Sequence, residues 1–275
     1  MSMNGGGWEP RGIEELEAVR AADVRFVLFD IDDTITEDGR LPEESYSALW
    51  RLSRAGLAAV PVTGRPAGWC DLIARQWPVD AVVGENGAFA FYMEDGKLEH
   101  LFHPEARDPQ AARIRLELLR DLVLAEVPGS RTAKDQFSRL FDLAIDFAEE
   151  EPVLPLEAAV RIRNLCESRG ARAKISSIHV NAWFGAYDKL SMAELYLTRR
   201  HGWNPVRDPG RVAYFGDSPN DEPMFERFPL SVGVANVRRF LPLMTARPAF
   251  ITAESHGRGF AEGIERLLLL REGRG

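Results

Sequence analysis

Phe29-Asp30-Ile31-Asp32-Asp33-Thr34-Ile35 is the stretch of sequence that decides the fold. It ends an apolar run over 24–29, interrupted only by Arg25, which predicts a buried strand. Asp30 and Asp32 stand where this strand ends, and like charges held so close repel each other unless a cation lies between them. The stretch therefore predicts a metal site, or two carboxylates that act as nucleophile and acid. A solvated loop after a strand is the alternative at this point.

The composition is that of an ordinary globular protein with room for two domains. The chain has 275 residues, of which 45% are hydrophobic and 28% charged. A net charge of −8 without a basic run argues against a nucleic-acid partner but is compatible with a small anionic substrate. Cys70 and Cys166 lack metal-binding spacing and are expected to be buried thiols. We expect a cytoplasmic protein with no membrane partner, because no signal peptide opens the chain and the run 267–270 is too short to span a bilayer.

Strand and helix patterns alternate in the first and last parts of the chain. The expected strands and helices of the first part are, in order, 24–29, 42–55, 58–62, 67–77 and 81–83. The alternation resumes near Asp188 and predicts parallel βαβ units, that is, an α/β fold. A short helix is expected over 12–20, and residues 1–10 are expected to be disordered.

The pattern between these two parts differs. A hairpin is predicted over 88–103, and the alternation over 141–147 is typical of an antiparallel strand. About 100 residues of mixed helix and strand pattern are enough for a separate α+β domain. We therefore predict a core from 1–86 and 187–275, with an inserted domain over 87–186.

Polar residues follow several predicted strands of the core. Because ligands bind at the carboxyl ends of strands in open α/β sheets, these residues are expected to share one cleft. They are Asp30, Asp32, Thr63, Gly64, Arg65, Asp217, Asn220 and Asp221, together with Lys189 at the start of the helix after the insertion. Carboxylates, a hydroxyl group, a small-residue turn and one lysine suit a phosphate group and a hard divalent cation.

The carboxylates have clear candidate roles in such a cleft. Mg²⁺ prefers oxygen ligands, so Asp30 and Asp217 are candidate ligands. Asp30 is also the candidate nucleophile that forms an aspartyl-phosphate, and Asp32 the candidate acid and base. Thr63 and the backbone N–H of Gly64 are candidates to hold the phosphoryl oxygens. The cation Lys189 would then balance the negative charge.

Further candidates for substrate binding each have a structural alternative. Arg65 could touch substrate or be an exposed turn residue, and Asn86 could act at a hinge or only shape a turn. Arg139, in the polar loop 134–139, and His179, on a predicted strand of the insertion, could read the leaving group. A solvated loop and an open polar sheet face are the alternatives for these two residues.

Four motifs in this order resemble those of the haloacid dehalogenase (HAD) superfamily of phosphatases. The first is Asp30-Ile31-Asp32-Asp33-Thr34, the second Thr63, the third Lys189 and the fourth Gly216-Asp217-Ser218-Pro219-Asn220-Asp221. The insertion and the run Gly84-Glu85-Asn86-Gly87-Ala88 resemble the subfamily IIB branch, which includes Cof-type, sucrose-phosphate and mannosylphosphoglycerate phosphatases.

This resemblance implies a Rossmann-like parallel-sheet HAD core with an inserted α+β cap of type IIB. It implies that Asp30 is the nucleophile and Asp32 the acid/base. It also implies that Asp30, the Asp32 carbonyl and Asp217 hold Mg²⁺, with Asp221 supporting the metal site. Asp33 departs from the pattern, because many members of the superfamily have glycine there.

The predicted function is a Mg²⁺-dependent phosphoric monoester hydrolase that acts on a small phosphorylated metabolite, a sugar phosphate, through an aspartyl-phosphate. One alternative is a phosphomannomutase-like phosphomutase, which returns the phosphoryl group to a sugar. Another is a catalytically silent sugar-phosphate-binding protein, although a pure binder has no need of an acid/base carboxylate. The sequence does not indicate the oligomeric state.

Overall fold

The computed structural model describes residues 9–176 and 178–273. Within these residues the chain forms two compact units. We call the first the α/β unit; it comprises 9–63, 76–82 and 197–273. We call the second the inserted unit; its described residues are 64–75, 83–176 and 178–196. The predicted domain boundaries after 86 and 186 stay a prediction.

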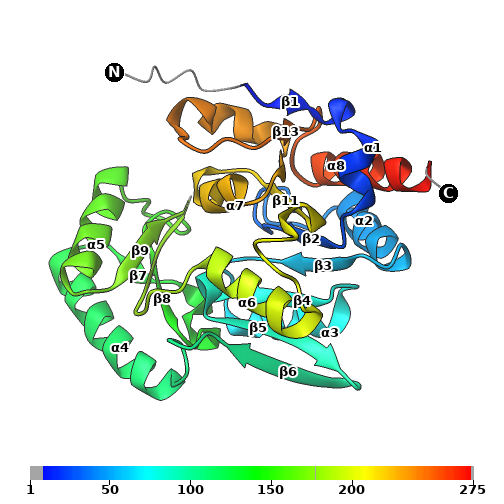
Figure 1. Cartoon of the computed structure of the whole chain (residues 1–275). Helices are drawn as coiled ribbons and strands as arrows, with labels where there is room; N and C mark the ends of the chain where they lie inside the picture. The colour runs from blue at the N-terminus through cyan, green and yellow to red at the C-terminus, as the bar shows by residue number, and fades with distance from the viewer. Residues whose placement is uncertain (1–8, 177, 274–275) are drawn as a thin grey trace, which may run out of the picture. The chain divides into compact units, whose positions relative to one another are not determined.

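The α/β unit is built on a six-stranded sheet in which every pairing is parallel, as predicted (Figure 1). The strands run in the order β1-β13-β12-β11-β2-β3. Their bounds are β1 Arg11–Gly12, β2 Phe26–Phe29, β3 Ala58–Pro61, β11 Val212–Gly216, β12 Leu230–Gly233 and β13 Phe250–Ile251. Phe29 of β2 pairs with Phe215 on one side and Pro61 on the other, so three strands end side by side.

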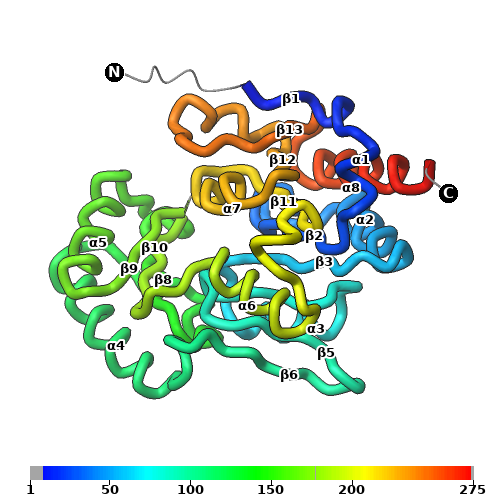
Figure 2. Tube along the Cα trace, in the orientation of Figure 1, coloured from blue at the N-terminus to red at the C-terminus, as the bar shows by residue number. Residues whose placement is uncertain are grey.

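Helices cover both faces of this sheet (Figure 2). Their bounds are α1 Ala18–Ala22, α2 Glu43–Arg54, α7 Glu222–Arg227 and α8 His256–Glu272. Successive side chains of a strand point to opposite faces. Phe215 packs on Phe260 of α8 with ring centroids 5.3 Å apart, and Tyr214 packs on Phe225 of α7 at 5.7 Å. Helices α7 and α8 therefore lie on opposite faces of β11.

The predicted helix over 12–20 is wrong for residues 12–17 and confirmed only for 18–20. Arg11 and Gly12 pair with β13, a short 3₁₀ turn follows over Ile13–Glu15, and α1 begins only at Ala18. Burial of Ile13 and Leu16 at a spacing of three residues fits a 3₁₀ turn as well as an α-helix. Pairing at the sheet edge, which the local pattern does not reveal, decides between them.

The inserted unit contains an antiparallel sheet in the order β7-β8-β10-β9. The strands are β7 Arg131–Thr132, β8 Asp142–Asp146, β9 Arg172–Ile175 and β10 His179–Trp183. Helices α4 (Pro109–Glu126) and α5 (Leu156–Ser168) pack on one face of it. The alternation predicted for 141–147 is confirmed there, because Leu143 and Ile145 join the core with these helices.

A three-stranded sheet, β4-β5-β6, holds the predicted hairpin. Its bounds are β4 Ala81–Gly84, β5 Phe89–Glu94 and β6 Lys97–Phe102. Helices α3 (Ala67–Gln76) and α6 (Lys189–His201) continue from one unit into the other. The remaining 3₁₀ turns are Glu85–Gly87, Lys134–Ser138, Pro209–Arg211, Pro219–Asp221 and Ala235–Leu243.

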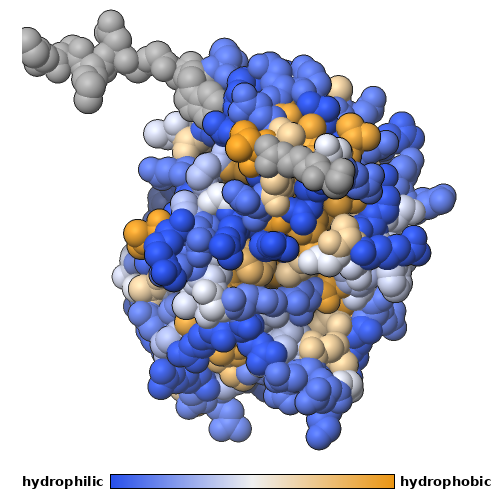
Figure 3. All heavy atoms as spheres, turned by 45° about the vertical axis from the view of Figure 1, so that its right-hand side comes forward, coloured by the Kyte–Doolittle hydropathy of each residue, from blue (hydrophilic) through white to orange (hydrophobic). Residues whose placement is uncertain are grey.

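Hydrophilic side chains dominate the face drawn in Figure 3. Among the residues that the structure describes, no helix combines the length and the apolar character needed to cross a membrane.

The predicted disorder over 1–10 falls, apart from Glu9 and Pro10, outside the described residues.

Candidate metal and phosphate site

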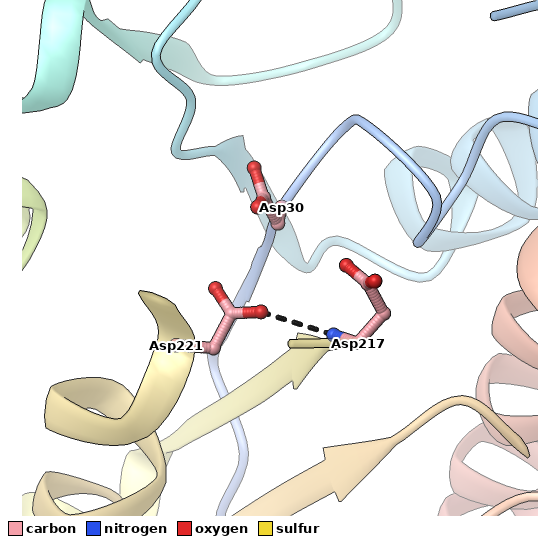
Figure 4. A group of neighbouring side chains, drawn as sticks. All are labelled: Asp30, Asp217 and Asp221. Carbon is pink, nitrogen blue, oxygen red and sulfur yellow. Dashed lines mark hydrogen bonds between the residues drawn. The ribbon is translucent and has the colours of Figure 1, made fainter. Parts of the chain in front are cut away.

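Three aspartates gather where β2 and β11 end (Figure 4). Asp30, Asp217 and Asp221 are only 4%, 3% and 0% exposed. Each offers one carboxylate oxygen, and these oxygens all lie within 4.8 Å of one another. The parallel pairing of β2 with β11 places Asp30 here, and its N–H donates to the Phe215 carbonyl at 3.0 Å. The structure thus brings together three of the predicted site residues.

Two side chains orient the Asp217 carboxylate. The Thr34 hydroxyl donates to its Oδ1 at 3.0 Å, and Asn236 Nδ2 lies 3.5 Å from its Oδ2. Asn236 also donates to the Asp33 carbonyl at 3.0 Å, so it links the loop after β2 to the loop after β11. Thr34 belongs to the first motif but had no predicted role. Asn236 was missed, because a single asparagine after a strand carries no pattern.

Asp221 shapes the loop that carries Asp217. Its carboxylate accepts hydrogen bonds from the Tyr214 hydroxyl at 2.5 Å, from the Asp217 N–H at 3.0 Å and from the Ser218 N–H at 3.2 Å. Asp221 and Ser218 also form a reciprocal capping box at the Pro219–Asp221 turn. The predicted role of Asp221 in supporting a metal site stays a prediction. Asn220 lies in the same turn, where its Oδ1 accepts from Ser218 Oγ at 2.7 Å.

The electrostatics of this group favour a bound cation. Burial, followed by the nearby charges of Asp221 and Asp30, raises the pKa of Asp217 to about 9. Burial and the Asp221 charge also raise the pKa of Tyr214 well above its usual value. A divalent cation among the carboxylates would offset this repulsion. The donor set consists of carboxylate oxygens, which are the ligands that Mg²⁺ prefers, so these residues fit the predicted ion.

The loop after β2 carries the other two aspartates of the first motif. Asp32 is partly exposed and is not one of the three clustered carboxylates. Asp33 has a φ of 58°, in the left-handed region that glycine adopts without strain. Aspartate is among the few other residues that occur there regularly. The backbone conformation thus explains why glycine suits this position and why Asp33 can replace it.

Thr63 follows β3, the strand next to β2, after one intervening residue, Val62. Its side chain is fully buried, and the preceding Val62 N–H donates to the Phe29 carbonyl at 2.8 Å. The ladder between β2 and β3 therefore continues up to the residues that precede Asp30 and Thr63. This arrangement places Thr63 at the same end of the sheet as the three aspartates, as predicted.

The other predicted residues lie in the inserted unit. Lys189 is buried at the first position of α6, which begins with reciprocal hydrogen bonds between Asp188 and Ser191. The Arg65 guanidinium lies 4.3 Å from the ring centroid of Trp69. The side chain of Asn86 lies beside Gly64, where a Cβ would come within 3.2 Å of Asn86 Oδ1.

Arg139 and His179 are held by protein partners. Arg139 makes ion pairs with Asp135 and Asp142, at 2.9 and 2.7 Å. His179 Nε2 lies 2.7 Å from a carboxylate oxygen of Glu149. Substrate contacts by Arg139 and His179 stay predictions.

Gly87 is a position where the fold of the inserted unit requires glycine. Its φ is 105°, and a Cβ would lie 2.0 Å from the Asp188 carbonyl oxygen, directly before Lys189. We expect Gly87→Ala to lower the free energy of unfolding by about 2 kcal/mol or more beyond backbone strain alone. Gly170→Ala is the matched control, since Gly170 has a φ of 78° but open space around it. Urea unfolding of both variants measures the difference, and equal midpoints would contradict the close approach.

The family model of haloacid dehalogenase-like hydrolases matches residues 27–107. A search of curated proteins found no significant match. Among solved structures, a Thermoplasma acidophilum protein is 18% identical, with a TM-score of 0.68 over 90% of this chain and 99% of that chain. A putative HAD/COF-like hydrolase of Plasmodium vivax is 17% identical, with a TM-score of 0.68 over 94% and 99%. The sucrose-phosphatase of Synechocystis sp. PCC6803, solved with sucrose and phosphate, is 18% identical, with a TM-score of 0.59 over 88% and 97%.

Proposed function

Since this chain shares the fold and the family model of the haloacid dehalogenase-like hydrolases, we propose that it is a Mg²⁺-dependent phosphatase. Its substrate is a small phosphorylated metabolite, a sugar phosphate, and the reaction passes through an aspartyl-phosphate on Asp30. The observation that carries this proposal is the group of three buried carboxylates at the ends of β2 and β11. Such a group is costly to bury without a cation and suits phosphoryl transfer with one.

The acidic group would hold the metal ion. In this proposal Asp30, Asp217 and the Asp32 carbonyl bind Mg²⁺, while Asp221 holds the loop of Asp217 through the hydrogen bonds described above. Mg²⁺ supplies positive charge that neutralises the phosphoryl oxygens and the attacking carboxylate. Thr34 and Asn236 keep Asp217 oriented before the ion binds.

In this proposal Asp30 is the nucleophile, and Asp32 transfers protons. An Asp30 oxygen attacks phosphorus, the bond between phosphorus and the ester oxygen breaks, and Asp32 donates its proton to the leaving alkoxide. Asp32, now a carboxylate, then takes a proton from water. The water oxygen attacks phosphorus, the bond to Asp30 breaks, and inorganic phosphate leaves. The partial exposure of Asp32 suits a group that exchanges protons with both an alcohol and water.

Thr63, the Gly64 N–H and Lys189 would stabilise the transferring phosphoryl group. The hydroxyl and the N–H donate to its oxygens, and the lysine balances its charge. Asn220, Arg65, Asn86 and His179 are proposed to contact the substrate around it. The likeness to a sucrose-phosphatase supports a sugar phosphate as the substrate class.

We expect hydrolysis of at least one sugar phosphate in a phosphometabolite panel with Mg²⁺. EDTA should lower the rate at least about 100-fold, and added Mg²⁺ should restore it. Without the cation, the negative carboxylates repel the negatively charged phosphoryl group. Phosphate release over time is the measurement. A rate that persists in EDTA would contradict the metal dependence.

The same assay separates the two alternatives. A phosphomutase given mannose 1-phosphate would form mannose 6-phosphate without releasing phosphate, which a coupled assay detects. A silent binder would release no phosphate from p-nitrophenyl phosphate or from any metabolite in the panel.

A further inference from the structure

Glu85 is a fully buried carboxylate outside the acidic group, and the proposed mechanism gives it no role. It lies in the turn between β4 and β5, where Glu85, Asn86 and Gly87 all have positive φ values of 43°, 56° and 105°. Glu85 is strained in this turn, because glycine adopts the left-handed region without a steric penalty and asparagine is enriched there, whereas glutamate is not. The turn therefore holds the Glu85 side chain inward at a cost in backbone energy.

The Glu85 carboxylate joins two segments that are far apart in the sequence. It accepts the Ala67 N–H at 2.9 Å, at the start of α3. It also accepts the N–H groups of Leu140, Phe141 and Asp142, with shortest distances of 2.9, 2.6 and 3.2 Å. In addition, the Glu85 N–H donates to the Arg65 carbonyl at 3.1 Å. One side chain thus fixes the turn 64–67 to the segment that leads into β8.

Arg139 strengthens the same connection. Its Nη1 donates to the Gly64 carbonyl at 3.1 Å and to Asp142 Oδ1 at 2.7 Å. Its Nε and Nη2 donate to the two oxygens of Asp135 at 3.1 and 2.9 Å. The Arg139 side chain is 2% exposed, so these bonds replace water almost entirely. The guanidinium therefore makes its hydrogen bonds with protein groups, one of which is the carbonyl of Gly64 in the turn 64–67.

Burying the charged groups of this network costs free energy that an apolar core would not. Glu85 and Asp142 are both fully buried, and burial together with the Asp142 charge raises the pKa of Glu85 to about 8. Burial also raises the pKa of Asp142, although Arg139 opposes that shift. Apolar residues of similar volume usually stabilise a protein as well or better than buried charges. A costly, fully bonded network at a strained turn suggests a role in positioning.

We propose that Glu85 and Arg139 are positioning residues that fix the turn 64–67, so that the Gly64 N–H keeps a fixed direction toward a phosphoryl oxygen. Arg139 holds the carbonyl of Gly64, while Glu85 holds Arg65 and Ala67 on the other side of the turn. These contacts hold the peptide groups that follow Gly64, so the backbone at Gly64 cannot rotate and turn its N–H without breaking them. This inference rests on the proposed function, since Gly64 matters to the reaction only as a phosphate ligand.

The test is steady-state kinetics of the full-length Glu85→Gln variant with p-nitrophenyl phosphate and Mg²⁺, together with inhibition by inorganic phosphate. Glutamine keeps the volume of Glu85 but replaces one acceptor oxygen by an NH₂ group that faces N–H donors. We expect kcat/KM to fall about 100-fold and the inhibition constant of phosphate to rise about tenfold, because small displacements of a phosphate ligand are costly. The half-saturating Mg²⁺ concentration should stay unchanged, because the acidic group is not altered.

Asp108→Ala is the matched control. Asp108 also accepts two backbone N–H groups in the inserted unit, those of Gln110 and Ala111 at the start of α4, and neither bond involves the turn 64–67. It should lower stability and leave all three constants within about twofold of the wild type. If Glu85→Gln is not recovered folded, the same measurements on Arg139→Lys test the proposal. Lysine cannot replace the forked hydrogen bonds of the guanidinium to Gly64, Asp135 and Asp142.

The outcomes separate this inference from the proposed function. A folded variant with wild-type kinetics and phosphate inhibition would overturn the positioning role alone. Equal losses in Glu85→Gln and Asp108→Ala would also overturn it, because the effect would then be one of stability. A wild-type protein that releases no phosphate from any substrate would overturn the proposed function and this inference with it.

Discussion

Asp30→Asn is expected to lower kcat at least about 10⁴-fold, because an amide cannot attack phosphorus or accept the phosphoryl group. Asparagine has nearly the shape of aspartate, and the change removes one charge from a group of three buried carboxylates. The folded state should therefore persist. Phosphate release at saturating substrate is the measurement, with thermal unfolding in the same buffer as a check on folding.

Asp38→Asn is the matched control for this variant. Asp38 is exposed in the loop that follows the first motif, and its φ of 50° is one that asparagine also tolerates. The same chemical change should leave kcat within about twofold of the wild type, since exposed surface charges contribute little. Turnover by Asp30→Asn above a small fraction of the wild-type rate would contradict a covalent intermediate on Asp30.

Asp217→Asn is expected to abolish activity and yet to stabilise the metal-free protein. The pKa of Asp217 is raised to about 9 by burial and by Asp221 and Asp30, so its ionised form is disfavoured in the folded state. Between the usual aspartate pKa of 3.8 and about 9 the folded state then binds more protons than the unfolded state, and stability falls as pH rises through this window. An asparagine side chain does not ionise, so the Asp217→Asn variant does not lose stability in this way as the pH rises.

Thermal unfolding in EDTA at about pH 5 and about pH 9 measures the effect. The variant should unfold at a higher temperature than the wild type, by on the order of 5 °C at the higher pH and by less at the lower pH. With saturating Mg²⁺ the order should reverse, because only the wild type gains stability by binding the ion. A variant less stable than the wild type in EDTA at both pH values would contradict repulsion within the acidic group.

The sequence predicted those parts of the fold whose signal is local. The apolar run before Asp30 became β2, and the alternation over 141–147 became β8 with Leu143 and Ile145 in the core. The parallel sheet followed from the alternation of strands and helices. Where a contact distant in sequence decides the structure, as in the pairing of Arg11 and Gly12 with β13, the local pattern misled.

The acidic group was predicted because its members follow strands that end at one edge of a parallel sheet. The residues that orient it were not all predicted: Asn236 lies in no motif, and its contacts with Asp33 and Asp217 depend on the folded loops. For Glu85, as for Asn86, the sequence left a hinge role and a turn open. Its four backbone partners lie up to 57 residues away, at a distance that no local pattern reveals.

The central claim is that the carboxylates at the ends of β2 and β11 hold a divalent cation. A crystal structure of the full-length protein grown with Mn²⁺, which can replace Mg²⁺ and has a measurable anomalous signal, tests it most directly. We predict an anomalous peak in contact with oxygens of Asp30 and Asp217. A well-occupied ion elsewhere, with no peak between these two carboxylates at saturating Mn²⁺, would contradict the account.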